Sequence, residues 1–254
     1  MPEPMYQDIQ RACELLLSAR HAVALTGAGI STPSGIPDFR SPGVGLWHRA
    51  DPFAVASIWA FRDSPEAFYD WLRPLALAAA QAQPNPAHLA LADLEQQGLL
   101  RAVITQNVDG LHQKAGSRRV LEVHGHTRTA TCLNCLDSVP TESWWPHFLA
   151  RGALPRCAHC HEILKPDVVL FGEPLPYEVM AAAQAEALLC DLMLVIGSSL
   201  DVMPASDLPF LARRRGARLV IVNYTETPAD AMADVVLRAN VAEVLPQLAA
   251  ARVV

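Results

Sequence analysis

The sequence predicts an α/β fold in which a doubly wound parallel sheet carries a smaller inserted lobe. Three observations predict it. Short aliphatic runs, typical of parallel strands covered on both faces, span 21–31, 101–107, 192–200 and 217–225. Helical patterns alternate with these runs, as they do in doubly wound sheets. Two further segments, 40–82 and 126–167, break the alternation and are therefore the expected insertions.

The chain opens with a helical pattern followed by a strand. Residues 6–19 place apolar side chains at helical spacing, and the run over 21–31 then enters the small residues Gly27-Ala28-Gly29. We expect a helix directly behind this turn. Strand, turn and helix together would form the opening of a dinucleotide-binding unit.

The later elements follow the same rhythm. A helix over 88–98 ends at Gly98, a suitable residue just past a helix end, and the strand at 101–107 comes next. Residues 204–216 are expected to form the crossover helix between the last two strands.

These elements predict one Rossmann-like domain with two insertions. The domain comprises 1–39, 83–125 and 168–254. Residues 40–82 begin with loop residues and continue with aromatic-rich helical segments, so we expect a loop followed by a helical module. Residues 126–167 hold four cysteines and form a zinc-binding module.

Composition excludes several classes of protein. The 254 residues are 51% hydrophobic and 18% charged, which excludes a disordered chain. No apolar run approaches the roughly 18 residues of a membrane span, and the acidic residues near the start argue against a signal peptide. The net charge of -6 disfavours nucleic-acid binding. We expect a cytoplasmic protein without a membrane partner.

The cysteines carry the most specific pattern that is visible without any comparison. Two Cys-x-x-Cys pairs, each on a short turn, can close a tetrahedral thiolate site for Zn²⁺; they are Cys132, Cys135, Cys157 and Cys160. A redox dithiol is the alternative. Four protein ligands leave no open coordination position, so the zinc is expected to be structural. His159 and His161 are rival ligands, better explained as solvated loop residues.

The two remaining cysteines have no metal-site spacing. Cys13 and Cys190 lie in apolar helical contexts, so buried free thiols are expected. Free thiols together with thiolate ligands indicate a reducing compartment and no disulfide.

The Gly-rich turn by itself indicates only a site where backbone could approach a phosphate. An ordinary tight turn is the alternative. The dinucleotide fingerprint G-x-G-x-x-G is not met, because Thr32 stands at its last position. No acidic residue ends a second strand about twenty residues on. An ordinary dehydrogenase is therefore disfavoured.

A series of motifs then resembles the sirtuin (Sir2) family of NAD-dependent protein deacylases, especially its compact bacterial and archaeal members. In chain order they are GAGISTPSGIPDFRS, ITQNVDGLHQKAGS, LEVHG, the paired CxxC, VVLFGEPLP, VIGSSL and LVIVN. The resemblance runs from about residue 4 to the C-terminus. It implies a protein lysine deacetylase that cleaves nicotinamide from NAD and transfers the acyl group of acyl-lysine to ADP-ribose.

The resemblance also implies the cofactor-binding residues. The pyrophosphate would lie on the backbone of the Gly27 turn, with hydroxyl groups donating from the loop after another strand. Asn223 would hold the adenosine ribose. The full implied set is Gly27, Ala28, Gly29, Asp38, Phe39, Arg40, Gln106, Asn107, Asp109, Gly197, Ser198, Ser199, Asn223 and Val241.

His124, Asn107 and Asp109 are the implied catalytic residues. Histidine titrates near neutrality, so His124 can accept a proton from a ribose hydroxyl at cellular pH. Asn107 and Asp109 would grip the nicotinamide carboxamide and orient the ribose. Without the family, an N-x-D at a strand end would more often be a turn. His112 is expected to make a structural hydrogen bond.

Four residues are implied to contact the substrate: Val169, Phe171, Gly172 and Val202. An acyl-lysine peptide could add there as a strand. The desuccinylase branch carries Tyr-x-x-Arg, whereas this chain has Tyr69-x-x-x-Arg73, with Arg displaced by about 100° on a helix. Acetyl-lysine is therefore the default substrate.

Three other functions compete with deacetylation: mono-ADP-ribosyl transfer, deacylation of other acyl chains, and binding by a zinc ribbon alone. His124 favours deacylation over ADP-ribosyl transfer, which need not use that base. The expected partners are acetylated proteins or peptides, with no nucleic acid, and the expected state is a monomer.

Overall fold

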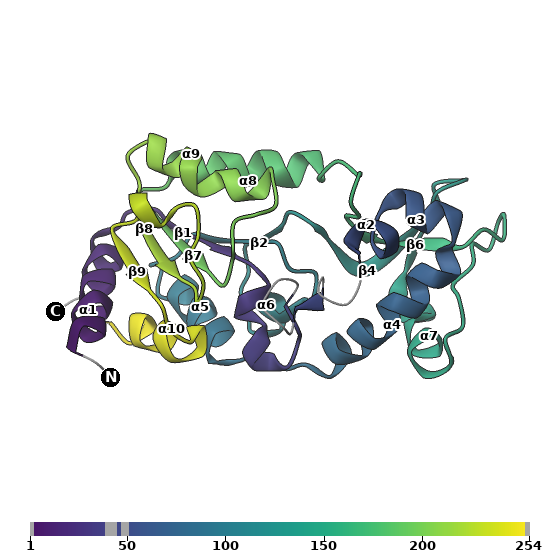
Figure 1. Cartoon of the computed structure of the whole chain (residues 1–254), viewed down its shortest axis with the longest axis horizontal. Helices are drawn as coiled ribbons and strands as arrows, with labels where there is room; N and C mark the ends of the chain where they lie inside the picture. Colours follow the sequence, from purple (N-terminus) through teal and green to yellow (C-terminus); the bar gives the residue numbers. More distant parts are fainter. Residues whose placement is uncertain (1–2, 39–44, 47–50, 252–254) are drawn as a thin grey trace.

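The computed structural model describes residues 3–38, 45–46 and 51–251. A six-stranded parallel sheet and its covering helices form the larger part (Figure 1). The order of the sheet is β3-β2-β1-β7-β8-β9. The strands are β1 Ala22–Thr26, β2 Ala102–Thr105, β3 Val120–Glu122, β7 Leu192–Ile196, β8 Arg218–Val222 and β9 Val235–Leu237. The predicted doubly wound sheet is confirmed.

Helices cover both faces of this sheet (Figure 1). On one face lie α1 Glu3–Ser18, α5 Pro86–Gln96 and α10 Val241–Ala249, and on the other α8 Tyr177–Leu189 and α9 Leu208–Arg214. All five residues of β1 are buried. Ala22 and Ala24 pack toward the first group of helices, and Val23 and Leu25 toward the second. This burial on both faces explains why the strands read as continuous aliphatic runs.

The predicted helices over 6–19, 88–98 and 204–216 are present. Asn85 caps α5 by accepting a hydrogen bond from the Ala87 amide, and Gly98 has a left-handed φ of +75° just beyond its end. The prediction of an α-helix directly after the Gly-rich turn is wrong. Residues Ala28–Ile30 and Thr32–Ser34 form two single 3₁₀ turns instead. Pro33 and the left-handed Gly35 (φ +86°) prevent an α-helix from continuing there.

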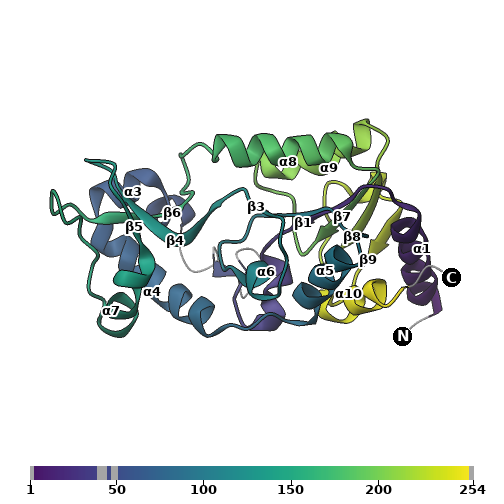
Figure 2. The ribbon, with the colours of Figure 1, turned by 180° about the vertical axis from the view of Figure 1, so that it is seen from behind.

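The smaller lobe lies beyond one end of the parallel strands (Figure 2). Within the described residues it contains an antiparallel sheet of order β5-β4-β6 and four α-helices. The strands are β4 Gly125–Cys132, β5 Ser138–Pro140 and β6 Leu164–Val168. The helices are α2 Pro52–Val55, α3 Ile58–Asp63, α4 Pro65–Gln81 and α7 Trp145–Arg151. Aromatic side chains of α3, α4 and α7 pack together to form its core.

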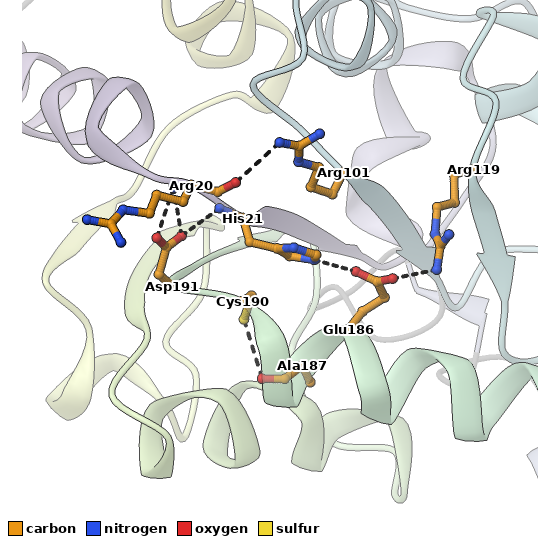
Figure 3. Close-up of polar contacts among 8 residues, drawn as sticks. All are labelled: Arg20, His21, Arg101, Arg119, Glu186, Ala187, Cys190 and Asp191. Atoms are coloured by element: carbon orange, nitrogen blue, oxygen red, sulfur yellow. Dashed lines mark hydrogen bonds and ion pairs between the residues drawn. The ribbon is translucent and has the colours of Figure 1, made fainter.

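Two carboxylates connect α8 and the start of β7 to the neighbouring strands (Figure 3). Glu186, which is buried, lies 2.6 Å from His21 Nε2 and 2.5 Å from an Arg119 nitrogen. Asp191 accepts hydrogen bonds from the Arg20 and His21 amides. The N-terminal ends of β1, β3 and β7 are thereby fixed relative to one another, at the edge of the sheet opposite the cavity described below. None of the helices in the described part of the chain has the length and hydropathy needed to cross a membrane.

Candidate active site

The candidate site is a cavity of about 1440 Å³ at the C-terminal ends of the parallel strands. Strands β1 and β7 are neighbours, and the strand order reverses between them, which is where open α/β sheets bind ligands. Walls come from both lobes. Every described residue of the predicted catalytic, cofactor and substrate sets lines this cavity. Phe39 and Arg40 fall outside the described residues.

The loops after β1 and β7 are in close backbone contact. A Cβ atom on Gly27 would lie 2.7 Å from the Gly197 carbonyl oxygen, and one on Gly29 would lie 2.8 Å from Gly197 Cα. The amides of Gly27 and Gly29 donate to the carbonyls of Ile196 and Gly197. Ala28 lies between these two glycines, and its amide has no backbone acceptor among the described residues. The glycines therefore serve packing between the loops, and Ala28 is the residue that can donate to a phosphate.

Polar side chains after β2 are joined to the same loops. Gln106 Nε2 donates to Ser198 Oγ at 2.9 Å, and Asn107 Nδ2 donates to the Gly27 carbonyl at 3.0 Å. Asp109 accepts from Ser31 Oγ at 2.7 Å. These bonds hold the predicted Asn107 and Asp109 in one fixed arrangement. Ser31 is the residue that sequence reasoning left without a role, although its place two residues after Gly29 was a signal for it.

His124 lies between the two sheets and lines the cavity. Its Nδ1 atom is 3.0 Å from the carbonyl oxygen of Gln106. A carbonyl only accepts, so this contact assigns the proton to Nδ1 and leaves the lone pair on Nε2. The backbone oxygen of His124 accepts from the Val169 amide at 2.8 Å. The ring is thus oriented by a residue at the end of β2, and the backbone is hydrogen-bonded to Val169 in the cavity wall.

His112 and His88 are buried histidines near the cavity rather than bases within it. His112 Nε2 lies 2.9 Å from Thr26 Oγ1, as expected for a structural hydrogen bond. Burial lowers the pKa of His112 to about 3 and that of His88 to about 4. His88 also completes the capping box of α5. Both rings are neutral at physiological pH, and their role is structural.

Residues 169–172 form the wall on the side of the smaller lobe. Phe171 is bound through its backbone on one edge, since its amide donates to the Ala56 carbonyl and its carbonyl accepts from Ile58. Gly172 has a φ of +87°, and a Cβ atom there would lie 2.3 Å from the Trp59 ring. Val202 lines the cavity from the loop after β7.

Tyr69 and Arg73 do not reach the cavity as an acid-binding pair. The Tyr69 hydroxyl is buried and donates to the Leu164 carbonyl at 2.7 Å. Arg73 donates to the carbonyls of Leu149 and Ala150. The α4 side chains that do line the cavity are Phe68, Trp71, Leu72, Leu75, Ala76, Ala79 and Ala80. The part of the cavity wall that α4 contributes is therefore apolar.

The four predicted metal ligands converge. Their sulfur atoms all lie within 4.8 Å of one another, and the pairs Cys132–Cys160 and Cys135–Cys157 are each 3.4 Å apart. Tetrahedral zinc with Zn–S bonds of about 2.3 Å requires similar spacing. Each pair sits on the same kind of turn, closed by Leu136 (φ +63°) and His161 (φ +64°). The donor set fits one structural Zn²⁺, and it has no open position for a substrate.

The remaining cysteines are both free thiols. Cys190 is buried as expected, and burial raises the pKa of its thiol to about 12. The prediction that Cys13 is buried was partly wrong. Its side chain is only half-buried, at the edge of the core that α1 helps to form. It faces α10, whose Gln247 carbonyl lies 3.9 Å from its sulfur.

The switch-point cavity, the glycine loops and the zinc-bearing lobe together define a nucleotide-binding enzyme of the α/β class. Residues 27–204 match the Sir2 family. The chain belongs to that family.

Its relatives are similar over nearly their whole length. NAD-dependent protein deacylase 2 of Archaeoglobus fulgidus is 46% identical over 96% of both chains. NAD-dependent protein deacetylase of Sulfurisphaera tokodaii is 47% identical over 94% of both. A solved Sir2 enzyme structure superposes with a TM-score of 0.91 at 46% identity, covering 96% of both chains. A complex of Sir2 with a p53 peptide and NAD⁺ gives 0.86 at 40%, covering 94% of this chain and 96% of that one.

Proposed function

We propose that this protein is an NAD-dependent protein lysine deacetylase. It cleaves nicotinamide from NAD and moves the acetyl group of an acetyl-lysine to ADP-ribose, giving free lysine, nicotinamide and O-acetyl-ADP-ribose. The observation that carries this proposal is the placement of His124. Its basic Nε2 belongs to a ring held by the nucleotide-side loops, while its backbone is bonded to the wall proposed for the acyl-lysine.

Binding of the nucleotide falls to the loops after β1, β7 and β8. The Ala28 amide and the Ser198 and Ser199 hydroxyls are the donors for the pyrophosphate. Gly27, Gly29 and Gly197 bring these donors together. Asn223 and Val241 line the end of the cavity proposed for the adenosine, and Asp38 the end proposed for nicotinamide. Phe39 and Arg40 keep their predicted cofactor roles as proposals.

Orientation and proton transfer fall to residues after β2 and β3. Asn107 and Asp109 orient the nicotinamide ribose and carboxamide, since Gly27 and Ser31 hold both side chains in place. Gln106 contacts ribose hydroxyls beside Ser198. His124 Nε2 takes the proton of a ribose hydroxyl as the acyl group moves. The neutral ring, with its proton on Nδ1, is the form that can do this.

The acyl-lysine enters between Val169–Gly172 and Val202. The wall is apolar, so a neutral acyl-lysine is accepted and a charged lysine is disfavoured by desolvation. Deacylation of longer neutral acyl chains is the second candidate function. The observation that favours it is the continuous apolar lining from α4, including Leu72, Leu75 and Ala76.

The deciding experiment is incubation of the protein with an acetylated peptide and NAD. Release of nicotinamide together with deacetylated peptide supports the proposal. Label transferred from NAD to protein would indicate mono-ADP-ribosyl transfer instead. Absence of NAD consumption would leave only the zinc-ribbon binding role. A panel of acetyl, butyryl, long-chain and succinyl peptides separates the two deacylase candidates.

We also propose a division of the chain into one domain and two inserted modules. We assign 1–39, 83–125 and 168–254 to the nucleotide-binding domain, 40–82 to the cofactor loop and helical module, and 126–167 to the zinc module. Support comes from β4–β6 and the cysteines, which lie within or beside the last segment. Limited proteolysis should cut near these limits if they are correct.

We further propose a cytoplasmic monomer that does not bind nucleic acid. None of the six cysteines forms a disulfide, and four of them are placed as thiolate ligands, which suits a reducing compartment. Light scattering behind size-exclusion chromatography tests the monomer, and fractionation of the source cell tests the compartment.

A further inference from the structure

Lys165 is a buried cation that the proposed reaction does not use. It lies in β6, and its side chain is only 8% exposed. Lysine is rarely buried unless its charge is paired, because removing an ammonium from water is costly. A buried ammonium at this position therefore requires acceptors close to it.

The ammonium has three acceptors, and all belong to the segment that follows it. Nζ donates to the Pro166 carbonyl at 3.0 Å and to the Val168 carbonyl at 2.9 Å. It also pairs with Glu173 Oε2 at 3.0 Å. Three acceptors match the three donors of an ammonium. The same Glu173 oxygen accepts from the Leu170 amide at 2.9 Å. Lys165 and Glu173 thus fold residues 166–173 into one closed unit.

This closed unit is the wall proposed for the acyl-lysine. Its one edge is bound to the smaller lobe through the backbone of Phe171, and its start is bound to the His124 carbonyl through Val169. The turn from Leu170 to Glu173 is also closed by a backbone hydrogen bond, in which the Glu173 amide donates to the Leu170 carbonyl at 3.0 Å. Lys165 adds the charged contact to this turn, because it pairs with the Glu173 carboxylate that accepts from the Leu170 amide.

We propose that Lys165, acting through Glu173, is a positioning residue that sets the shape of the peptide-binding wall. This inference rests on the proposed function. The His124 ring is oriented by the Gln106 carbonyl, and Lys165 contacts neither residue, so loss of Lys165 leaves the base in place. The effect should therefore fall on peptide binding, with nucleotide binding and proton transfer preserved.

The experiment compares wild type with Lys165→Met, Glu173→Gln and the double variant, measuring kcat and the KM for acetyl-peptide and for NAD separately. Each single variant is expected to raise the peptide KM about tenfold or more, with the NAD KM within about twofold. The double variant should resemble the singles, because both changes break the same unit. If Lys165→Met fails to fold, Glu173→Gln, which keeps the shape of the side chain, gives the answer.

A control separates positioning from general loss of stability. Asp234→Asn removes a mostly buried carboxylate that pairs with Arg213 and Arg218 at the far end of the main sheet. It should lower the melting temperature and leave both KM values unchanged. Equal changes in the two KM values, or an unchanged peptide KM, would overturn the inference. An inactive wild type would instead refute the proposed function.

Discussion

Gly27 and Gly197, although 170 positions apart in the sequence, meet so closely that a Cβ atom on Gly27 would lie 2.7 Å from the Gly197 carbonyl oxygen. The contact joins the loop after β1 to the loop after β7. These two strands are neighbours at the point where the strand order reverses. The loops that follow them carry the predicted phosphate donors. The nucleotide site therefore depends on the absence of a side chain at this position.

Gly27→Ala should weaken NAD binding at least about tenfold and destabilise the fold by about 1–3 kcal/mol, because the added methyl group forces the two loops apart. Isothermal titration with NAD and urea unfolding measure both effects. Gly98→Ala is the matched control. It adds a methyl group where nothing lies within 4 Å, so it should cost only the left-handed strain of about 1 kcal/mol. Unchanged NAD affinity in Gly27→Ala would contradict the assigned role.

His124→Ala should lower the deacetylation rate by about 100-fold to 10,000-fold, because the general base is lost. Steady-state turnover of acetyl-peptide measures the loss, and circular dichroism checks the fold. His147→Ala, an exposed histidine of α7, serves as the control and should retain wild-type turnover. A variant at position 124 with normal turnover would sink the assignment of the base.

Removal of the metal should unfold the smaller lobe. Cys132→Ser is expected to lower the zinc content and the melting temperature by about 10 °C, since several kcal/mol of folding free energy come from such a site. Deacetylation should fall with it, because β6 leads into residues 169–172, the wall proposed for the acyl-lysine. Cys13→Ala, outside the cluster, should keep both zinc and stability. Full activity in a zinc-free protein would show that the metal is not structural.

Acidification should destabilise the protein through its buried histidines. Burial lowers the pKa of His88 to about 4, below the unfolded value of about 6.5, so the unfolded state binds more protons in between. The stability that the neutral ring contributes is present above about pH 6.5 and is lost as the pH falls toward 4. His88→Gln keeps an acceptor for the α5 cap and should flatten this slope by about one proton. Urea unfolding between pH 4 and 7 measures it, with exposed His147→Gln as the unchanged control. An equal slope in His88→Gln would exclude this source of acid sensitivity.

Succinyl-lysine peptides should be turned over at least about 100-fold less efficiently than acetyl-lysine peptides. Tyr69 and Arg73 are bonded to backbone carbonyls of the smaller lobe, so neither is placed to pair with an entering carboxylate, whose desolvation is costly. Comparison of kcat/KM on matched peptides gives the ratio, with butyryl-lysine as the neutral control for size. Comparable rates for succinyl and acetyl peptides would mean that another cation reaches the acyl group.

Much of the fold could be read from the chain because burial leaves a local pattern. The aliphatic runs of β1, β2, β7 and β8 are continuous since both faces are covered. Helix α8 escaped prediction because its Ala-rich sequence has no apolar stripe, although high helix propensity was a usable signal. The three-residue strands β3 and β9 are too short to carry a period. The prediction of a helix after the Gly-rich turn was wrong. It relied on the strand–turn–helix order of dinucleotide-binding units, and Pro33 and Gly35 favour 3₁₀ turns there instead.

The sequence by itself determined the parallel sheet, the four converging cysteines and, through its motifs, the identity of the residues that line one cavity. Each of these depends on residue type and local spacing. Only the tertiary structure decided which partners those side chains and amides bind. It bonded Tyr69 and Arg73 to backbone carbonyls of the smaller lobe. It gave the Gly27 and Gly29 amides their acceptors at Ile196 and Gly197, and it paired the Lys165 ammonium with Glu173. Such outcomes depend on which distant backbone groups compete for each donor, and that competition exists only once the chain is folded.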